Sequence, residues 1–259
     1  MKKLLLLIAL LTPLAWSTGC VGQKDDPEEE PQDNTDPQTE FDESEAGRCL
    51  VLDFTGTWCV NCPAMHTAIE SAMEQAPDII VPVAVHCLQL DPMSVPICDD
   101  LALRFGVNAY PSVVVDLEPG TLFTTASPEL LLARCEQLRK ARGKAATLEM
   151  EGLVEHQTDL KITVSATAQR DGDYTLHLLR LQDGIVSPQT GASENYVHND
   201  VLCEWLDAPE SFNGLHAGDS FSATFNFDIS QGYVKVVALV CRGGIADNAK
   251  GEAFGYMDL

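Results

Sequence analysis

The chain is poor in positive charge and lacks long apolar runs beyond its N-terminus. Its 259 residues include 16 Lys and Arg against 39 Asp and Glu, a formal charge of −23. Such a surface cannot neutralise a phosphate backbone and is not drawn to anionic lipid headgroups, so we expect no nucleic-acid partner. No later stretch approaches the roughly 20 apolar residues that a transmembrane helix needs. We therefore expect no membrane-spanning helix.

Cysteine, by contrast, is abundant. Nine cysteines are more than we expect in a cytosolic domain without thiol chemistry. They indicate either an oxidising compartment or a function that uses the thiols. Hydrophobic residues make up 45% of the chain and charged residues 21%, so a sizeable core can form. The length favours two folded domains once a leader and a tail are set aside.

The first 19 residues have the pattern of a secretory signal peptide. Two lysines precede an apolar run over residues 4–11, as in the basic and apolar parts of such a leader. Pro13 interrupts the run before it is long enough to span a bilayer. We therefore assign residues 1–19 to a signal peptide.

Cys20 follows this leader directly. The stretch Trp-Ser-Thr-Gly-Cys resembles the lipobox of bacterial lipoproteins, which implies lipidation of Cys20; Ser17 departs from it, because a strict lipobox has an aliphatic residue there. An ordinary signal peptide with a stray cysteine is the alternative. Residues 23–46 include 11 acidic residues and one lysine, too little apolar surface to fold. We expect residues 20–46 to be a lipidated N-terminus and an acidic, disordered linker. Lys-Asp-Asp at 24–26 resembles an export signal of surface lipoproteins in Bacteroidota and favours the outer membrane over the inner one.

Residues 47–143 alternate between predicted strands and helices. Continuous apolar runs predict buried strands, and apolar residues at helical spacing predict the helices between them. Ser127 before Pro128 is typical of a helix start. Strands are expected at 49–54, 79–85, 112–115 and 121–125, and helices before Pro77, over 101–105 and from 128 to 143.

Motifs in this segment resemble the thioredoxin-like superfamily. Asp53 lies in the first strand, six residues before Cys59, and Trp58-Cys-Val-Asn-Cys62 follows that strand. The later run Phe-Gly-Val-Asn-Ala-Tyr-Pro111 matches the segment that carries the superfamily's cis-proline. The resemblance implies an α/β thioredoxin-like domain over 47–143, in which Cys59 attacks, Cys62 resolves and Asp53 moves the proton.

The chemistry of each position supports this assignment. Cys59 stands at a helix N-terminus, where the dipole favours thiolate, so we expect it to be exposed and acidic, with Cys62 shielded. A carboxyl beneath Cys62 has a raised pKa and can accept the thiol's proton. We expect Trp58, Tyr110 and Pro111 to bind substrate, because a cis Pro111 would place the Tyr110 backbone where an extended chain can add as a strand.

Other interpretations of these residues are possible. The Cys59–Cys62 pair can be an inert disulfide. Zinc is disfavoured because a second tight cysteine pair is missing, and we expect neither a metal nor a cofactor. His66 falls on the Glu70 side of its helix, which favours a solvated side chain. His86 has no serine and aspartate grouping that would indicate a hydrolase.

Residues 144–259 switch to the period of two that is typical of strands. Asp-Gly at 171–172 predicts a hairpin turn. Val234, Val236, Val240 and the alanine between them form one face of a strand, which we interpret as core. We expect six or seven strands in an all-β, sandwich-like (immunoglobulin-like) domain; they include 160–168, 174–181, 196–205, 221–229 and 233–241.

The stretch Asn195-Tyr-Val-His198-Asn199 is either a binding site or a strand edge with satisfied side chains. Together with Ile185-Val-Ser-Pro-Gln, the thioredoxin-like motifs and the leader, it resembles the Omp-type outer-membrane lipoproteins of Bacteroidota. That resemblance implies architecture and location rather than a reaction.

Six further cysteines allow 15 disulfide pairings. Locality and the division into domains select three, because short loops close easily and each domain is expected to pair within itself. These are Cys87–Cys98, Cys203–Cys241 and Cys49–Cys135.

The sequence therefore predicts a lipid-anchored thiol–disulfide oxidoreductase of the cell envelope, which acts on protein disulfides and needs a redox partner. The alternative is a non-catalytic surface lipoprotein that uses both domains for binding or structure.

Overall fold

The computed structural model describes residues 41–259, apart from 89, 157–158, 209–210, 229–232 and 256–259. The predicted signal peptide, the lipidation site at Cys20 and most of the acidic linker lie outside the described residues. None of the helices in the described part is both long enough and apolar enough to cross a membrane.

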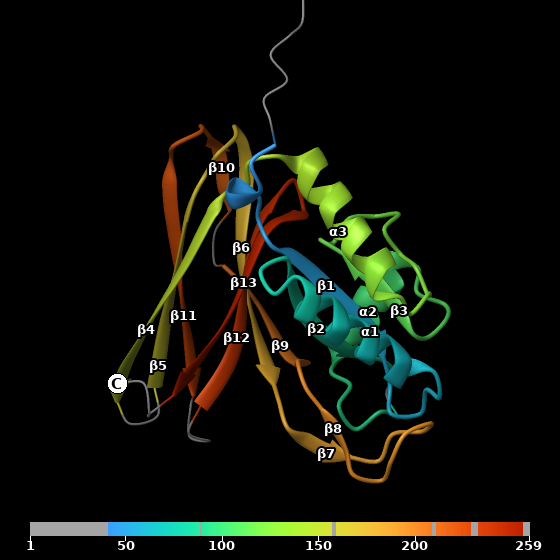
Figure 1. The fold of residues 1–259 in the computed structure, drawn as a ribbon. Helices are drawn as coiled ribbons and strands as arrows, with labels where there is room; N and C mark the ends of the chain where they lie inside the picture. Colours follow the sequence, from blue (N-terminus) through green and yellow to red (C-terminus); the bar gives the residue numbers. More distant parts are fainter. Residues whose placement is uncertain (1–40, 89, 157–158, 209–210, 229–232, 256–259) are drawn as a thin grey trace, which may run out of the picture. The chain divides into compact units, whose positions relative to one another are not determined.

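The fold is mixed α/β and rich in strands (Figure 1). The elements of the N-terminal half, residues 41–143, are η1 (Glu43–Glu45), β1 (Cys49–Thr55), α1 (Cys62–Gln75), β2 (Ile80–His86), α2 (Pro96–Phe105), β3 (Ser112–Val115) and α3 (Pro128–Arg142). Those of the C-terminal half, residues 144–259, are β4 (Thr147–His156), β5 (Asp159–Thr167), β6 (Gly172–Gln182), β7 (Ile185–Ser187), β8 (Tyr196–His198), β9 (Val201–Asp207), β10 (Phe212–Leu215), β11 (Ser220–Asp228), β12 (Tyr233–Arg242) and β13 (Ile245–Gly255).

One large sheet runs through both halves. Its strand order is β13-β12-β6-β9-β2-β1-β3, with β10 paired to β6. β1 and β2 are parallel, and β3 is antiparallel to β1. β2 meets β9 of the C-terminal half in parallel at Ala84 and Val201. A boundary near residue 143 stays a prediction of the sequence, since the structure joins residues 41–259 as one unit.

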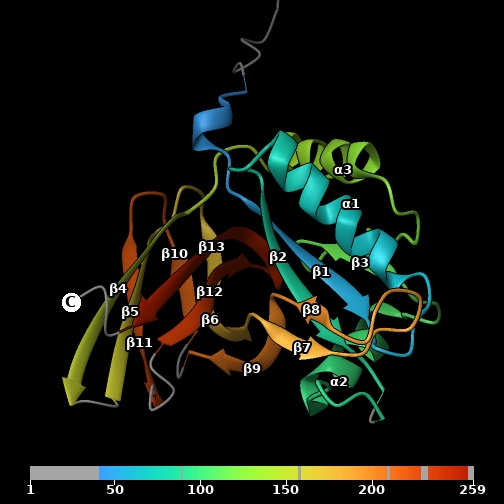
Figure 2. The same cartoon turned by 60° about the horizontal axis from the view of Figure 1, so that its bottom comes forward.

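Helices and a second sheet cover this large sheet (Figure 2). α1 and α3 pack on the face of β1 that carries Cys49 and Val51, and α2 packs on the face that carries Leu50 and Leu52. The core of that second face continues to Leu239 of β12. The opposite face of β6 and β12 packs on a three-stranded sheet of order β11-β5-β4.

Most predicted elements are found, with three corrections. The first is the number of strands in the C-terminal half, because the described residues there form ten strands, β4–β13, where the sequence predicts six or seven. The predicted core face of β12 is confirmed, because Val234, Val236 and Val240 are buried against the three-stranded sheet. The predicted strand at 121–125 is an isolated bridge between Val113 and Phe123. The predicted strand at 196–205 is broken at Asp200, whose φ of 57° ends the extended backbone between β8 and β9.

Candidate redox site

A disulfide joins Cys59 and Cys62 at the turn between β1 and α1, with the two Cα atoms 5.5 Å apart. Cys62 opens α1, and Pro63 in the first turn suits a helix start. The expectation that Cys59 is exposed is wrong for this state, because Cys59 is 5% and Cys62 2% exposed. The reason is a segment of the C-terminal half that lies over the turn.

This covering segment is the β7–β8 hairpin with its loop. The Gln189 side-chain amide donates to the carbonyl oxygen of Cys59 at 2.8 Å and to that of Gly56 at 3.2 Å. The Thr190 N–H donates to the Thr57 carbonyl at 2.8 Å. Gly191 lies so close to the turn that an added Cβ would collide with a carbonyl oxygen there. The sequence singled out the hairpin's polar stretch but gave no sign that it meets the cysteines.

Trp58 and the cis-proline segment form the other side of the turn. The Tyr110–Pro111 peptide bond is cis, as the motif predicted. The rings of Trp58 and Tyr110 meet edge to face with centroids 5.0 Å apart. Trp58 is 38% exposed, and its indole N–H donates to the Cys87 carbonyl at 3.3 Å. These contacts bring Trp58, which precedes Cys59 in the chain, against Tyr110 of the cis-proline segment.

A groove of about 550 Å³ opens beside Trp58. Leu88 and Leu90 form one wall, and Leu90 is 95% exposed. Pro188 and Thr190 of the hairpin loop also line the groove. An apolar, open surface therefore reaches the CxxC turn from this side.

Asp53 lies buried in β1, as predicted. It is 4% exposed, and burial raises its pKa to about 7 from 3.8. Within the described part of the chain, its Oδ1 has no hydrogen-bond partner. Asp53 and Cys62 line the same small cavity of about 20 Å³. A carboxyl with this pKa can both take and return a proton near neutral pH.

Histidines surround this small cavity. His198 of β8 lines it, with its ring centroid 5.3 Å from that of His86 and 4.8 Å from that of Tyr196. His86 Nδ1 is 3.2 Å from the Asp91 carboxylate. Burial, and then His86, lower the pKa of His198 below its ordinary value. A neutral His198 is therefore the favoured form near pH 7.

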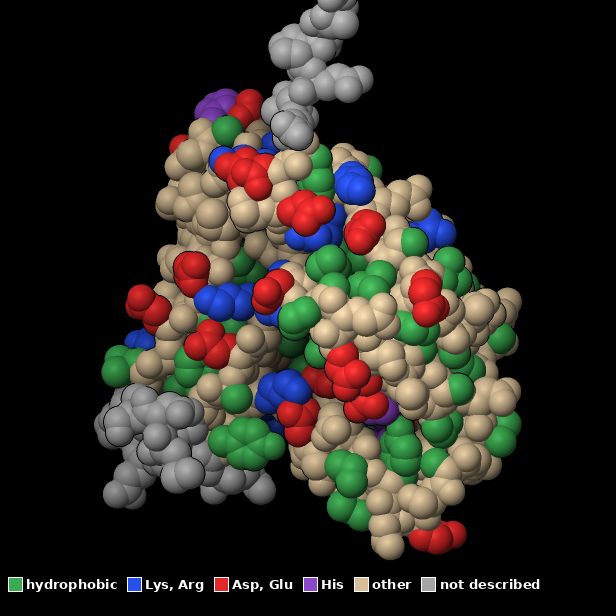
Figure 3. Space-filling view, viewed as in Figure 1, with side chains coloured by type: hydrophobic (Ala, Val, Ile, Leu, Met, Phe, Trp, Pro, Cys, Tyr) green, Lys and Arg blue, Asp and Glu red, His purple; other side chains and the backbone are tan. Residues whose placement is uncertain are grey.

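A wider groove of about 450 Å³ adjoins the small cavity along α1. Asp53, His66 and Asn199 line both spaces. His66 is on the Glu70 side, as predicted, and pairs with that carboxylate at 3.2 Å. Acidic side chains and a histidine gather over α1, beside a hollow, on the face in Figure 3. Among the described residues, no cluster of three or more His, Cys, Asp or Glu side chains is arranged to hold a metal ion.

The other six described cysteines are free thiols, not the three predicted disulfides. Two predicted pairs are neighbours: the Cys49 thiol contacts the Cys135 carbonyl at 3.6 Å, and the Cys87 thiol contacts the Cys98 carbonyl at 3.6 Å.

The third predicted pair, Cys203 with Cys241, is wrong. β6 lies between β9 and β12, and strand spacing alone puts residues on such strands about 10 Å apart. Cys241 also lies opposite Thr175 of β6, whereas Cys203 falls near Arg180 and Leu181 at the other end of that strand. A disulfide needs Cα atoms within about 7 Å.

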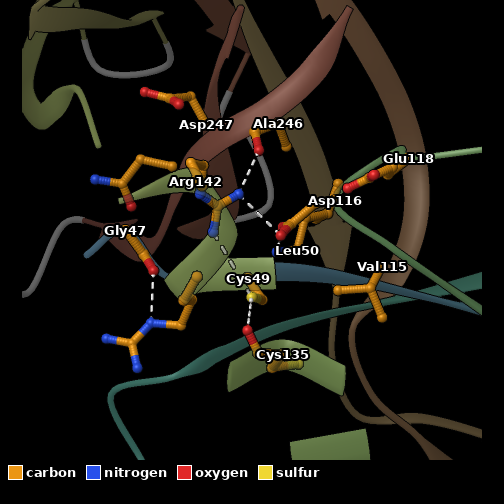
Figure 4. A network of polar contacts seen from close by, with 12 residues as sticks. Gly47, Cys49, Leu50, Val115, Asp116, Glu118, Cys135, Arg142, Ala246 and Asp247 are labelled. Atoms are coloured by element: carbon orange, nitrogen blue, oxygen red, sulfur yellow. Dashed lines mark hydrogen bonds and ion pairs between the residues drawn. The ribbon is translucent and has the colours of Figure 1, made fainter. Parts of the chain in front are cut away.

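A polar network surrounds Cys49 on the side away from the CxxC turn (Figure 4). Arg142 of α3 bonds Asp116 at 2.9 Å and the carbonyl of Ala246 in β13 at 2.6 Å. Asp116 accepts from the Leu50 N–H at 2.8 Å. Hydrogen bonding with Cys135 and burial raise the pKa of Cys49 well above its ordinary value. This thiol is therefore a poor nucleophile, and the network links β1, α3 and β13.

Two solved structures share this fold. HBP35 of Porphyromonas gingivalis superposes with a TM-score of 0.66 at 19% identity, over 80% of this chain and 75% of that one. The crystal structure of a protein from Agrobacterium tumefaciens gives 0.55 at 14% identity, over 80% of this chain and 94% of that one. The sequence matches no protein-family model and no curated protein. At these identities the likeness shows the fold alone. HBP35 comes from a member of the Bacteroidota, which fits the resemblance of the leader and linker to lipoproteins of that group.

Proposed function

We propose that this protein is a thiol–disulfide oxidoreductase that acts on protein disulfides. In this proposal a thioredoxin-like part, residues 47–143, carries the reaction and an immunoglobulin-like sandwich, residues 144–259, supports it. The observation that supports it most is the Cys59–Cys62 disulfide beside the buried carboxyl of Asp53, whose Oδ1 has no hydrogen-bond partner among the described residues. A structural disulfide has no need of such a carboxyl, which is costly to bury.

The reaction starts from the reduced pair. The Cys59 thiolate, favoured by the α1 dipole, attacks one sulfur of a substrate disulfide. A mixed disulfide forms at Cys59, and the other substrate sulfur leaves as a thiolate. Cys62 then gives its proton to Asp53 and attacks the Cys59 sulfur. The Cys59–Cys62 bond forms, the mixed disulfide breaks, and the second substrate sulfur leaves with its electron pair. Two electrons thus pass to the substrate, and the reverse sequence oxidises a dithiol.

The groove beside Trp58 suits an extended apolar segment of a substrate. Its walls are apolar and exposed at Leu88 and Leu90, and such surfaces mark binding sites for other chains. Backbone of the substrate would pair near Tyr110 and Pro111. An unidentified dithiol or disulfide partner would then reset the cysteine pair.

We place this activity at the cell envelope, on a lipid anchor at Cys20 and on the outer membrane. This location rests on the leader and linker sequence. The acidic linker would hold the folded part away from the membrane surface.

A non-catalytic binding protein is the second candidate. It is favoured by the Gln189 loop, which leaves Cys59 only 5% exposed in the disulfide form. In that case the disulfide would fasten the turn on which the hairpin rests.

Insulin reduction by dithiothreitol separates the two. The wild-type protein should accelerate insulin precipitation, Cys59→Ser should not, and Cys203→Ser, which removes a half-buried thiol outside the site, should match wild type. Equal rates with wild type and Cys59→Ser would refute the oxidoreductase proposal.

A further inference from the structure

His198 and Asp53 come from opposite halves of the chain and meet at one cavity. Asp53 is in β1 and His198 in β8, and both line the space of about 20 Å³ below Cys62. Within the described residues, neither Asp53 Oδ1 nor His198 Nε2 has a hydrogen-bond partner. Buried polar atoms are rarely left unpaired, so two of them at one small cavity call for a shared explanation.

The size of the cavity suits a single water molecule. A buried water needs a space of at least about 10–15 Å³ and two or more polar partners. The cavity provides about 20 Å³, and the carboxyl oxygen and the imidazole nitrogen provide the partners. One water between them would satisfy both atoms.

The donors and acceptors are complementary. The unpartnered ring nitrogen of His198 is Nε2. A neutral imidazole that carries its proton on Nδ1 presents Nε2 as an acceptor. A protonated Asp53 presents an O–H donor. The bridging water accepts from Asp53 and donates to His198.

We propose that His198 is a positioning residue of the redox site, which holds the protonated Asp53 through one bridging water. The inference rests on the proposed function, because it gives the C-terminal half a part in preparing the acid that serves Cys62. In the proposed exchange Asp53 takes the proton of Cys62 as the disulfide closes and returns it when the disulfide is reduced. His198 acts through Asp53, by holding its protonated form. A water that donates to Nε2 becomes a better acceptor and a weaker second donor, so it favours the protonated carboxyl of Asp53 over the carboxylate. Loss of the acceptor at His198 should therefore lower the pKa of Asp53.

Other titratable groups near the cavity must stay in place for the test to be clear. By element they are Asp53 on β1, Cys62 and His66 with Glu70 on α1, His86 on β2 with Asp91 after it, and Tyr196 on β8; Glu74 and Asp200 face the adjoining groove. Phenylalanine at 198 preserves a ring beside His86 and Tyr196 and removes the acceptor. His198→Gln keeps an acceptor oxygen.

The experiment is a pH titration of the aspartate carboxyl carbons by ¹³C NMR in the oxidised, full-length protein. The Asp53 signal is the one lost in Asp53→Asn. His198→Phe should lower its midpoint by about half a unit or more, the size expected for one hydrogen bond. His198→Gln and the surface variant His216→Leu should stay near wild type. His198→Leu replaces His198→Phe if the latter does not fold.

An unchanged or raised Asp53 midpoint in the variant without an acceptor would overturn the inference, as would an equal fall in His198→Gln. The titration does not depend on enzymatic turnover, so it can refute the role of His198 without refuting the oxidoreductase activity, and the insulin assay can do the opposite. A protein inactive toward insulin but with the expected shift refutes the oxidoreductase and leaves His198 in its role. A protein that reduces insulin but shows no shift of the Asp53 midpoint supports the oxidoreductase and refutes the role of His198.

Discussion

Replacing Asp53 with asparagine should stabilise the protein, and more strongly as the pH rises. Burial raises the pKa of Asp53 to about 7 in the folded state, whereas the unfolded chain ionises near the ordinary value of 3.8. The favourable contribution of the protonated carboxyl is fully present below the unfolded pKa. It is lost as the pH rises through 4 to about 7, because the unfolded state releases the proton first.

The size of the effect follows from the two pKa values. Each unit of difference is worth about 1.4 kcal/mol, so ionisation of Asp53 costs the folded state about 4 kcal/mol at pH 8.5 and under about 1 kcal/mol at pH 4. Asparagine removes this dependence but keeps the shape. The stability of Asp53→Asn minus that of wild type should therefore increase by about 3–4 kcal/mol between these pH values.

Urea unfolding of the oxidised proteins at five or six pH values measures this difference. Asp78→Asn is the matched control, because it removes an exposed carboxylate that forms no ion pair with the other described residues. A difference that does not change with pH would refute the raised pKa. If Asp53→Asn became less stable than wild type as the pH rose, the carboxylate would be a structural partner and its catalytic assignment would be wrong. In the insulin assay the same variant should slow exchange, since Cys62 loses its proton acceptor.

Three further predictions concern other parts of the molecule. Gly191→Ala should lift the hairpin loop from the turn and speed disulfide reduction by dithiothreitol several-fold in stopped-flow measurements. Gly184→Ala, also at positive φ but in open space, should leave the rate of reduction unchanged. Equal rates for Gly191→Ala and wild type would contradict the covering role of the loop. Arg142→Met should cost about 3–5 kcal/mol in urea unfolding, because it leaves Asp116 buried without its ion-pair partner; a loss under about 1 kcal/mol would be inconsistent with that pairing. Iodoacetamide should label Cys203 before the five buried thiols, and a bridged Cys203–Cys241 peptide in an unreduced digest would contradict the strand order.

Local patterns sufficed for much of the N-terminal half. The apolar run over β1, the Ser-Pro start of α3 and the cis Pro111 each have a signal that spans only a few residues. Asp53 could be placed for the same reason, because Asp53 and Cys59 are six residues apart and alternation along a strand fixes which side chains share a face.

Long-range neighbours were not predictable in this way. Gln189 meets the Cys59 carbonyl across 130 residues, and no pattern near either residue marks that contact. The pairing of Cys203 with Cys241 failed because it assumed that two cysteines in one sheet are adjacent, whereas β6 separates their strands. The break at Asp200 was missed since a positive φ at a non-glycine residue leaves little trace in the sequence.

The structure gives the C-terminal half a direct share in the cysteine site. β9 extends the large sheet beside β2, and the core that packs on α2 continues into β12. From that fixed edge the β7–β8 hairpin reaches the CxxC turn with Gln189 and the small cavity with His198. Access of a reductant to Cys59 and the protonation of Asp53 therefore both depend on residues far along the chain. A change in the hairpin can alter the two properties separately, because Gln189 bonds the backbone of the turn and His198 faces the carboxyl below it.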